Sequence, residues 1–182
     1  MTLSDEALAA DAKAGDRAAF GALVRRHKTA IHGLCRRYLG DADDAYDVLQ
    51  DAFAAAWLGL ARYDPSRAFG PWLRTIALNK CRDFGRRRSV RRMLLSAFRR
   101  EPAPANAPLE TDEAAETDDR RLARLDKEIA ALPSAYKEVL ILTALSGLSH
   151  KQAAQELGLS TKAVEMRVSR AKKRLAERMK ET

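Results

Sequence analysis

The sequence predicts an all-α protein: two small helical domains joined by a flexible linker, the second of them a helix-turn-helix domain. Apolar residues recur every three or four positions over most of the chain, which is the period of an amphipathic helix. No segment shows the alternation with period two that a half-buried strand requires. Residues 101–119 interrupt the helical pattern with seven acidic side chains, three prolines and no basic side chain, a composition typical of a solvated linker.

The chain has 182 residues, which is enough for two small domains that each bury a modest core. We therefore expect an N-terminal helical domain over residues 1–96 and a C-terminal helical domain over residues 120–182. The linker between them is expected over residues 97–119.

The first two predicted helices carry long apolar stripes. The first stripe runs through residues 20–38, and Gly40 is placed to end that helix. The second stripe runs through residues 45–60, and Asp43 or Asp44 can cap the start of its helix, because a short acidic side chain accepts hydrogen bonds from the first free backbone amides.

Prolines mark the boundaries of the next two predicted helices. Residues 63–66 break the second helix, and a third should start near Pro71, since proline suits a first helical turn. After the linker, a stripe over residues 122–132 predicts a helix that stops near Pro133. Ser134 can then cap a further helix that ends at Gly147.

The last two predicted helices have the layout of a helix-turn-helix. Ser149 can cap a short helix over residues 150–157, and Gly158 can supply the left-handed backbone of a tight turn. Ser160 can cap the final helix, which runs from residue 161 towards residue 179. Similar pairs of short helices also occur in plain helical bundles. The basic residues on the final helix favour a DNA-binding motif over a plain bundle.

Basic residues are concentrated in two blocks. The net charge of the chain is +8, yet residues 82–100 alone carry eight arginines and one acid. Residues 120–182 carry 14 basic and seven acidic side chains. Separate basic blocks with an acidic insert between them are typical of a protein that binds a polyanion, so nucleic acid is the leading class of partner.

Two sequence blocks together resemble the bacterial extracytoplasmic-function (ECF) sigma factors of RNA polymerase. In the first block, residues 44–57 and 69–80 are similar to the family's segments that bind polymerase and read the promoter −10 element. In the second block, residues 132–140 and the helix-turn-helix of residues 147–174 are similar to the domain that reads the −35 element. A helix-turn-helix alone would be weak evidence, but both blocks occur here in the family's order.

The resemblance implies a set of binding residues. Asp47, Gln50 and Asp51 would dock on the coiled-coil arm of the largest polymerase subunit, and the flap of core polymerase would also be contacted. Many family members carry an acid where this chain has Tyr46, so that contact is expected to be altered here.

The segment over residues 61–70 would capture a flipped base of the melted −10 strand, at the cost of unstacking it. The residues expected to contact −10 DNA are Phe69, Arg74, Asn79, Lys80, Arg82 and Arg86, with core packing as the competing role for Phe69.

Seven residues of the final helix are expected to contact duplex −35 DNA. A carboxylate can accept from cytosine, and an arginine can donate to guanine or to phosphate. The residues expected to read bases are Glu165, Met166, Ser169 and Arg170, and those expected to bind phosphates are Lys162, Arg167 and Lys173. An anti-sigma protein that covers both domains is a further partner implied by the resemblance.

Catalytic and metal functions are not indicated. His27, His32 and His150 lie on different elements, and the sequence has no glycine-rich phosphate loop and no nucleophile elbow. His32 and Cys35 are one helical turn apart, but two ligands are too few for a zinc site. Cys81 is interpreted as a structural thiol, with a redox role as the alternative. We therefore expect no enzyme activity, no metal, no cofactor and no membrane insertion, and a cytoplasmic location.

A dimeric helix-turn-helix regulator that acts apart from the polymerase is the alternative function. It would account for residues 149–175 and bind duplex operator tightly on its own, at half-sites about one helical turn apart. It would leave the acidic side chains of residues 47–51 and the arginines of residues 82–100 unexplained.

Overall fold

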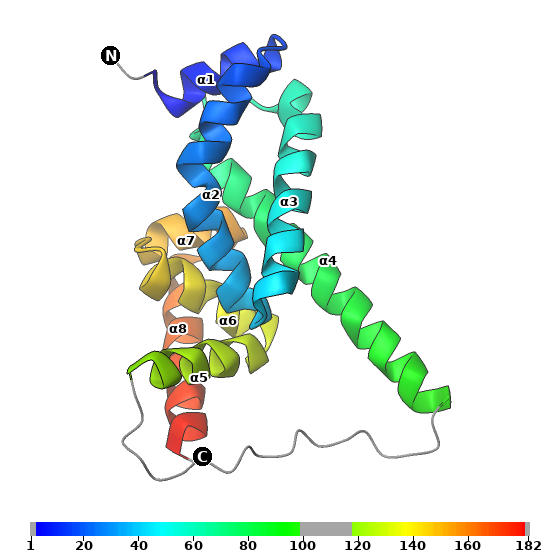
Figure 1. Ribbon diagram of the computed structural model, residues 1–182. Coiled ribbons are helices and arrows are strands. Elements are labelled where there is room, and N and C mark those ends of the chain that lie inside the picture. Colours follow the sequence, from blue (N-terminus) through cyan, green and yellow to red (C-terminus); the bar gives the residue numbers. More distant parts are fainter. Residues whose placement is uncertain (1–2, 99–117, 181–182) are drawn as a thin grey trace.

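The computed structural model describes residues 3–98 and 118–180, and all regular structure in these two ranges is helical (Figure 1). The N-terminal half contains α1 (Asp5–Lys13), α2 (Arg17–Leu39), α3 (Ala42–Gly59), a 3-10 turn (Leu60–Arg62) and α4 (Phe69–Phe98). The C-terminal half contains α5 (Asp118–Ala131), α6 (Ser134–Leu140), a π-helical turn (Ile141–Leu145), α7 (His150–Leu157) and α8 (Thr161–Lys180). The prediction of an all-α fold is confirmed.

The N-terminal bundle is built around α2, which packs against α1, α3 and α4. Gly40 ends α2 with a left-handed φ of 73°, as predicted. The cap of α3 is not Asp43 or Asp44 but Asp41, whose side chain accepts hydrogen bonds from the backbone amides of both. The three acids lie within four positions of one another, and the extended backbone at Asp41 makes it the one whose side chain turns back on the helix.

Two features of the N-terminal half were not predicted. One is α1, which buries Leu8, Ala9 and Ala12. The last long helix, α4, begins at Phe69, two residues before Pro71, and its C-terminal part extends away from the bundle (Figure 1). Within that projecting part, Val90 and Met93 are exposed.

The C-terminal bundle consists of α5 to α8 and contains the predicted helix-turn-helix. Ser149 and Gln152 form a reciprocal capping box at the start of α7, and Gly158 has a left-handed φ of 64°. Ser160 accepts a hydrogen bond from the Ala163 amide at the start of α8. Ser134, in contrast, is the first residue of α6 and makes no side-chain cap there.

The two halves share one continuous buried core, in which α5 packs on α2 and α7 packs on α4. The helix bounds differ slightly from the predicted domain limits, because α4 extends to Phe98 and α5 already begins at Asp118. The acidic, proline-containing part of the predicted linker lies outside the described residues. None of the helices within residues 3–98 and 118–180 is both long and apolar enough to cross a membrane.

Candidate polymerase and nucleic-acid interfaces

The outer face of α3 carries the three residues predicted to bind the polymerase. Asp47, Gln50 and Asp51 are all exposed, whereas the neighbouring Val48 and Leu49 are buried. Positions three and four apart lie on one face of a helix, so the three polar side chains form a single patch. We call these three residues the α3 patch.

A groove of about 590 Å³ separates the α3 patch from α4. The α4 wall of the groove carries Arg87, Arg88 and Arg91, and Arg88 Nη1 lies 2.5 Å from Asp44 Oδ2. Burial raises the pKa of the Asp44 carboxyl above its ordinary value, although the Arg88 guanidinium opposes the shift. The groove therefore presents carboxylates on one wall and guanidinium groups on the other, which suits a partner surface that carries both charges.

Tyr46 stands beside the α3 patch with 48% of its surface exposed. Its ring centroid lies 5.9 Å from Lys28 Nζ, near the outer limit of a cation–π contact. An aromatic ring therefore stands next to the patch, at the position where the resemblance leads us to expect an acid.

Phe69, expected either to contact −10 DNA or to pack in the core, is buried in this structure. Its exposed fraction is 0%, and its ring lies 5.4 Å from Trp72, 5.7 Å from Tyr63 and 5.4 Å from the His27 ring, between centroids. A base can stack only on a ring whose face is open, so Phe69 is placed as a core residue here.

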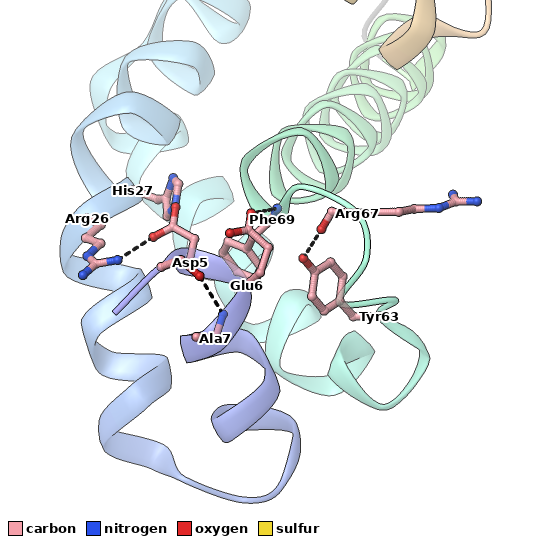
Figure 2. Close-up of polar contacts among 9 residues, drawn as sticks. Asp5, Glu6, Ala7, Arg26, His27, Tyr63, Arg67 and Phe69 are labelled. Carbon is pink, nitrogen blue, oxygen red and sulfur yellow. Dashed lines mark hydrogen bonds and ion pairs between the residues drawn. The ribbon is translucent and has the colours of Figure 1, made fainter. Parts of the chain in front are cut away.

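Helix α1 holds the start of α4 in place, as Figure 2 shows. The Glu6 carboxylate accepts a hydrogen bond of 3.3 Å from the Phe69 amide. Asp5 Oδ1 lies 2.8 Å from Arg26 Nη1, and its other oxygen lies 2.7 Å from His27 Nε2. Burial raises the pKa of Asp5, but the hydrogen bonds from Arg26 and His27 outweigh burial and leave the pKa below its ordinary value.

The segment predicted to capture a base is fixed at several points. Lys13 Nζ donates to the Tyr63 carbonyl at 2.9 Å, and the Tyr63 hydroxyl donates to the Arg67 carbonyl. Tyr63 itself is buried, while residues 64–68 are exposed between these anchors. The backbone contacts from α1 and Tyr63 therefore form a frame around an open stretch of residues. The residues of α1 that build this frame were not predicted from the sequence. The signal for this helix was Ser4, which caps it, followed by two acidic residues in its first turn.

The polar residues predicted to contact −10 DNA follow one another along α4. Asn79 and Arg86 are exposed, and Lys80 is half-buried. Asn79 Oδ1 accepts a hydrogen bond of 2.8 Å from Arg82 Nη1, and Arg86 pairs with Asp83. These side chains thus lie along one helix without converging on a closed pocket.

Arg74 and Arg82 differ from the other basic residues of α4 because each binds a carboxylate of the C-terminal half. Arg74 donates from Nε and Nη2 to Glu156, at 3.1 and 2.5 Å. Arg82 donates from Nε and Nη2 to Glu138, at 2.7 and 2.6 Å. The hydrogen bond to Glu138, which outweighs the opposing effect of burial, raises the pKa of Arg82.

The final helix presents the residues predicted to read the −35 element. Val164, Val168 and Ala171 fix one face of α8 against the domain core. The opposite face is exposed at six of the seven predicted positions, Lys162, Glu165, Met166, Ser169, Arg170 and Lys173, and Arg167 is half-buried. A helix with basic and hydrogen-bonding side chains along its open face fits the major groove of DNA.

The two cysteines lie together in the core, with both thiols fully buried and their sulfur atoms 3.8 Å apart. The hydrogen bond from Cys81 to Cys35, together with burial, raises the pKa of Cys81. A protonated, buried thiol is a poor nucleophile and a poor metal ligand. In residues 3–98 and 118–180, no group of three or more His, Cys, Asp or Glu side chains is arranged to hold a metal ion.

Comparisons with known proteins agree with this geometry. The family described as Sigma-70 region 2 matches residues 23–92, and the family described as Sigma-70, region 4 matches residues 122–175. The chain is 42% identical to the RNA polymerase sigma factor NccH of Alcaligenes xylosoxydans xylosoxydans, over 94% of this chain and 92% of that one. It is 40% identical to the sigma factor CnrH of Cupriavidus metallidurans, over 95% and 93% of the two chains.

Solved structures show the same arrangement of helices. The structure of CnrH in complex with the cytosolic domain of CnrY matches with a TM-score of 0.71 and 37% identity, over 97% of each chain. The sigma factor RpoE of Bartonella quintana, solved with the anti-sigma factor NepR, matches with a TM-score of 0.67 and 25% identity, over 88% of this chain and 96% of that one. Two matched sigma regions, two relatives of 40% identity or more and a shared fold lead to one conclusion: the chain belongs to the ECF sigma factors of the sigma-70 family.

Proposed function

We propose that this sigma factor binds core RNA polymerase through the α3 patch and directs it to promoters whose −10 and −35 elements are bound by α4 and α8. The observation that carries this proposal is that the α3 patch, an arginine-rich α4 and a capped helix-turn-helix occur on one chain. A regulator that acts without polymerase would need only the last of these. The protein would act in the cytoplasm by binding alone, without catalysing a reaction.

The α3 patch is proposed as the contact with the coiled-coil arm of the largest polymerase subunit, and the C-terminal domain as the contact with the flap. The chain carries a net charge of +8, so an exposed pair of carboxylates with no role in DNA binding points to a protein partner. The arginines across the groove give that partner a second, oppositely charged wall. An arm with both acidic and basic side chains complements this groove.

At the −10 element, α4 and the exposed residues 64–68 would hold the bases of the melted strand. Lys80 and Arg86 supply charge for the phosphates, and the Asn79 amide can hydrogen-bond a base edge. Trapping an unstacked base costs a few kcal/mol, which stacking and hydrogen bonds recover, so no hydrolysis is needed to open the duplex.

At the −35 element, α8 would enter the major groove. Glu165 and Arg170 can read cytosine and guanine, respectively, while Lys162, Arg167 and Lys173 bind phosphates. Met166, with 46% of its surface exposed, can contact a thymine methyl group. Affinity for this element should therefore fall steeply with salt concentration.

An anti-sigma protein is proposed as the regulatory partner. The Bartonella RpoE was solved in complex with the anti-sigma factor NepR, and CnrH was solved in complex with the cytosolic domain of CnrY. The present chain shares the fold of both proteins, so we expect it to bind an anti-sigma protein through a comparable surface.

The proposal is tested by single-round transcription with bacterial core polymerase on a pool of genomic promoter fragments. We expect transcripts that require the protein, and a loss of about tenfold or more when Asp47 and Gln50 are both changed to alanine, as for a central interface contact. Asp11→Ala removes an exposed carboxylate from α1 and should leave transcription unchanged.

One combination of results would contradict the proposed function. If the protein supports no transcript and binds duplex DNA tightly in the absence of core polymerase, the sigma-factor function is wrong for this chain and the dimeric regulator is favoured. A sigma factor should bind promoter DNA weakly until core polymerase holds it.

A further inference from the structure

Two charged side chains of α1 reach the two ends of the segment that joins the 3-10 turn to α4. At the start of this segment, Lys13 Nζ donates to the Tyr63 carbonyl at 2.9 Å. At its end, the Glu6 carboxylate accepts a hydrogen bond from the Phe69 amide at 3.3 Å (Figure 2). We call residues 63–69 the capture loop, because they lie in the part of the chain proposed to hold a flipped base of the −10 strand.

The capture loop is also tied internally. The Tyr63 hydroxyl donates to the Arg67 carbonyl, and burial raises the pKa of Tyr63, so the hydroxyl stays protonated and remains a donor. The Ser66 amide donates to Asp64 Oδ1 at 3.0 Å, which closes a tight turn. Residues 64–68 are nevertheless exposed. The backbone of the loop is therefore held at several points while its side chains remain open to a ligand.

Helix α1 is itself fixed on the bundle. The two carboxylate oxygens of Asp5 lie 2.8 Å from Arg26 Nη1 and 2.7 Å from His27 Nε2, both on α2. The apolar face of α1 is buried in the same core as α2 and α3. The match to Sigma-70 region 2 begins at residue 23, so this support for the capture loop lies before the matched residues.

Glu6 acts on the start of α4 as a capping side chain acts from within the chain. Phe69 is the first residue of α4, and the first amides of a helix have no partner inside it. A carboxylate at this end is also favoured by the helix dipole. The hydrogen bond between Phe69 and Glu6 therefore fixes the point at which the capture loop passes into α4.

A loop held in one shape has an advantage in capturing a base. Capture must offset the free energy of unstacking that base. A loop that becomes ordered at the same moment also loses conformational entropy, which lowers the affinity further. A loop that is already ordered avoids this loss and keeps its hydrogen-bonding groups in fixed positions, so a wrong base leaves some of them without a partner.

We propose that α1 sets how selectively this sigma factor reads the −10 base, with Glu6 and Lys13 as positioning residues that hold the capture loop. The inference rests on the proposed function of residues 61–70 in base capture. Glu6 and Lys13 act through the backbone of the loop and not on the base. Loss of either contact should therefore weaken discrimination between bases more than it weakens binding to the sugar–phosphate backbone.

The test uses holoenzyme assembled from the full chain and bacterial core polymerase, with a promoter identified in the transcription experiment. Two fluorescent DNA duplexes are made with the −10 element already melted. One keeps the −10 bases of the non-template strand, and the other carries abasic sites in their place. Anisotropy gives the Kd for each duplex, and the selectivity ratio is the Kd of the abasic duplex divided by the Kd of the intact one. Melting, −35 binding and phosphate contacts are common to both duplexes, so the ratio reports base capture alone.

We expect Glu6→Ala to lower the selectivity ratio by about fivefold, the scale of one net hydrogen bond. Lys13→Met keeps the length of the side chain but removes the donor, and should lower the ratio in the same direction. Glu6→Gln keeps an oxygen that can accept from the Phe69 amide and should hold the ratio within about twofold of wild type. The matched control is Asp11→Ala, which removes an exposed carboxylate from the same helix and should leave the ratio unchanged.

Two results would overturn the inference. If Glu6→Ala keeps the wild-type ratio, even with both Kd values raised, α1 supports the fold without setting selectivity. If Glu6→Gln lowers the ratio as much as Glu6→Ala, the hydrogen bond to Phe69 is not the cause.

Failure of the proposed function would look different. A wild-type ratio near one would mean that residues 61–70 capture no base, and the inference would fail together with that function. A wild-type ratio well above one that Glu6→Ala leaves unchanged is a failure of the inference alone.

Discussion

Phe69 lies where rings from α2, α4 and the segment before α4 meet. Its neighbours Tyr63 and Trp72 are themselves in contact, with centroids 4.8 Å apart, and the Tyr63 ring meets Phe69 nearly edge-on at 85°. Aromatic rings in such arrangements contribute beyond the area they bury. At this scale, burial places the side chain: Phe69 supports the segment that carries residues 64–68, and neighbouring rings cover it in this structure.

Changing Phe69 to alanine should therefore destabilise the protein. We expect the free energy of unfolding to fall by about 3–5 kcal/mol, the usual cost of removing a buried phenylalanine. Urea denaturation followed by circular dichroism measures this. Met166→Ala, on the exposed face of α8, serves as the control and should change stability by less than about 0.5 kcal/mol. An equally small effect for Phe69→Ala would show that the ring is not a core residue.

At the scale of elements, the start of α7 sets the geometry of the helix-turn-helix. The Ser149 hydroxyl accepts a hydrogen bond of 3.2 Å from the Gln152 amide, and Gln152 Oε1 accepts one of 2.9 Å from the Ser149 amide. An eight-residue helix is too short to be stable alone, so its caps and its packing must hold it. Because α7 lies between α4 and α8, its orientation fixes the position of the recognition helix.

Replacing Ser149 with alanine removes one half of this capping box. The expected loss is about 1 kcal/mol in the free energy of unfolding, because a backbone amide of α7 loses its partner. The comparison is Ser169→Ala, an exposed position in the interior of α8, where alanine is the better helix former and stability should hold or rise slightly. Chemical denaturation of both variants provides the measurement, and equal effects at the two serines would argue against the cap.

At the scale of the whole molecule, the two domains meet closely at Gly40. This residue has a left-handed φ of 73°, and a Cβ built on it would lie 2.7 Å from the Cβ of Ala130 in α5. Gly158 has a similar φ of 64° but open space around it. The two glycines thus share one backbone conformation and differ in whether the other domain is adjacent.

Gly40→Ala should therefore disturb the domain contact in a way that Gly158→Ala cannot. Strain from the left-handed backbone should cost each variant about 1–2 kcal/mol. The clash with Ala130 should add about 1–3 kcal/mol at position 40, unless the domains separate to relieve it. Urea denaturation gives the energies, and small-angle scattering should show expansion for Gly40→Ala alone. Identical behaviour of both variants would mean that the domains do not meet at Gly40 in solution.

Much of the fold could be predicted from the sequence because helix signals are local. The stripe that ends at Gly40, the capped start at Ser149 and the turn at Gly158 all act within a few residues, and all three predictions are confirmed. Helix α1 was missed because nine residues with a narrow apolar face give a weak periodic signal, and its stability comes from packing on α2.

The candidate site could be predicted less completely. Exposure of Asp47 or Arg170 follows from its place on an amphipathic helix, whereas the burial of Phe69 depends on three elements that meet around it. The sequence by itself determined the helices, the two basic blocks and the family resemblance, since each is encoded in residues close along the chain. Only the tertiary structure decided that Arg74 and Arg82 bind Glu156 and Glu138, because these partners are 82 and 56 positions apart and meet only when the two halves pack together.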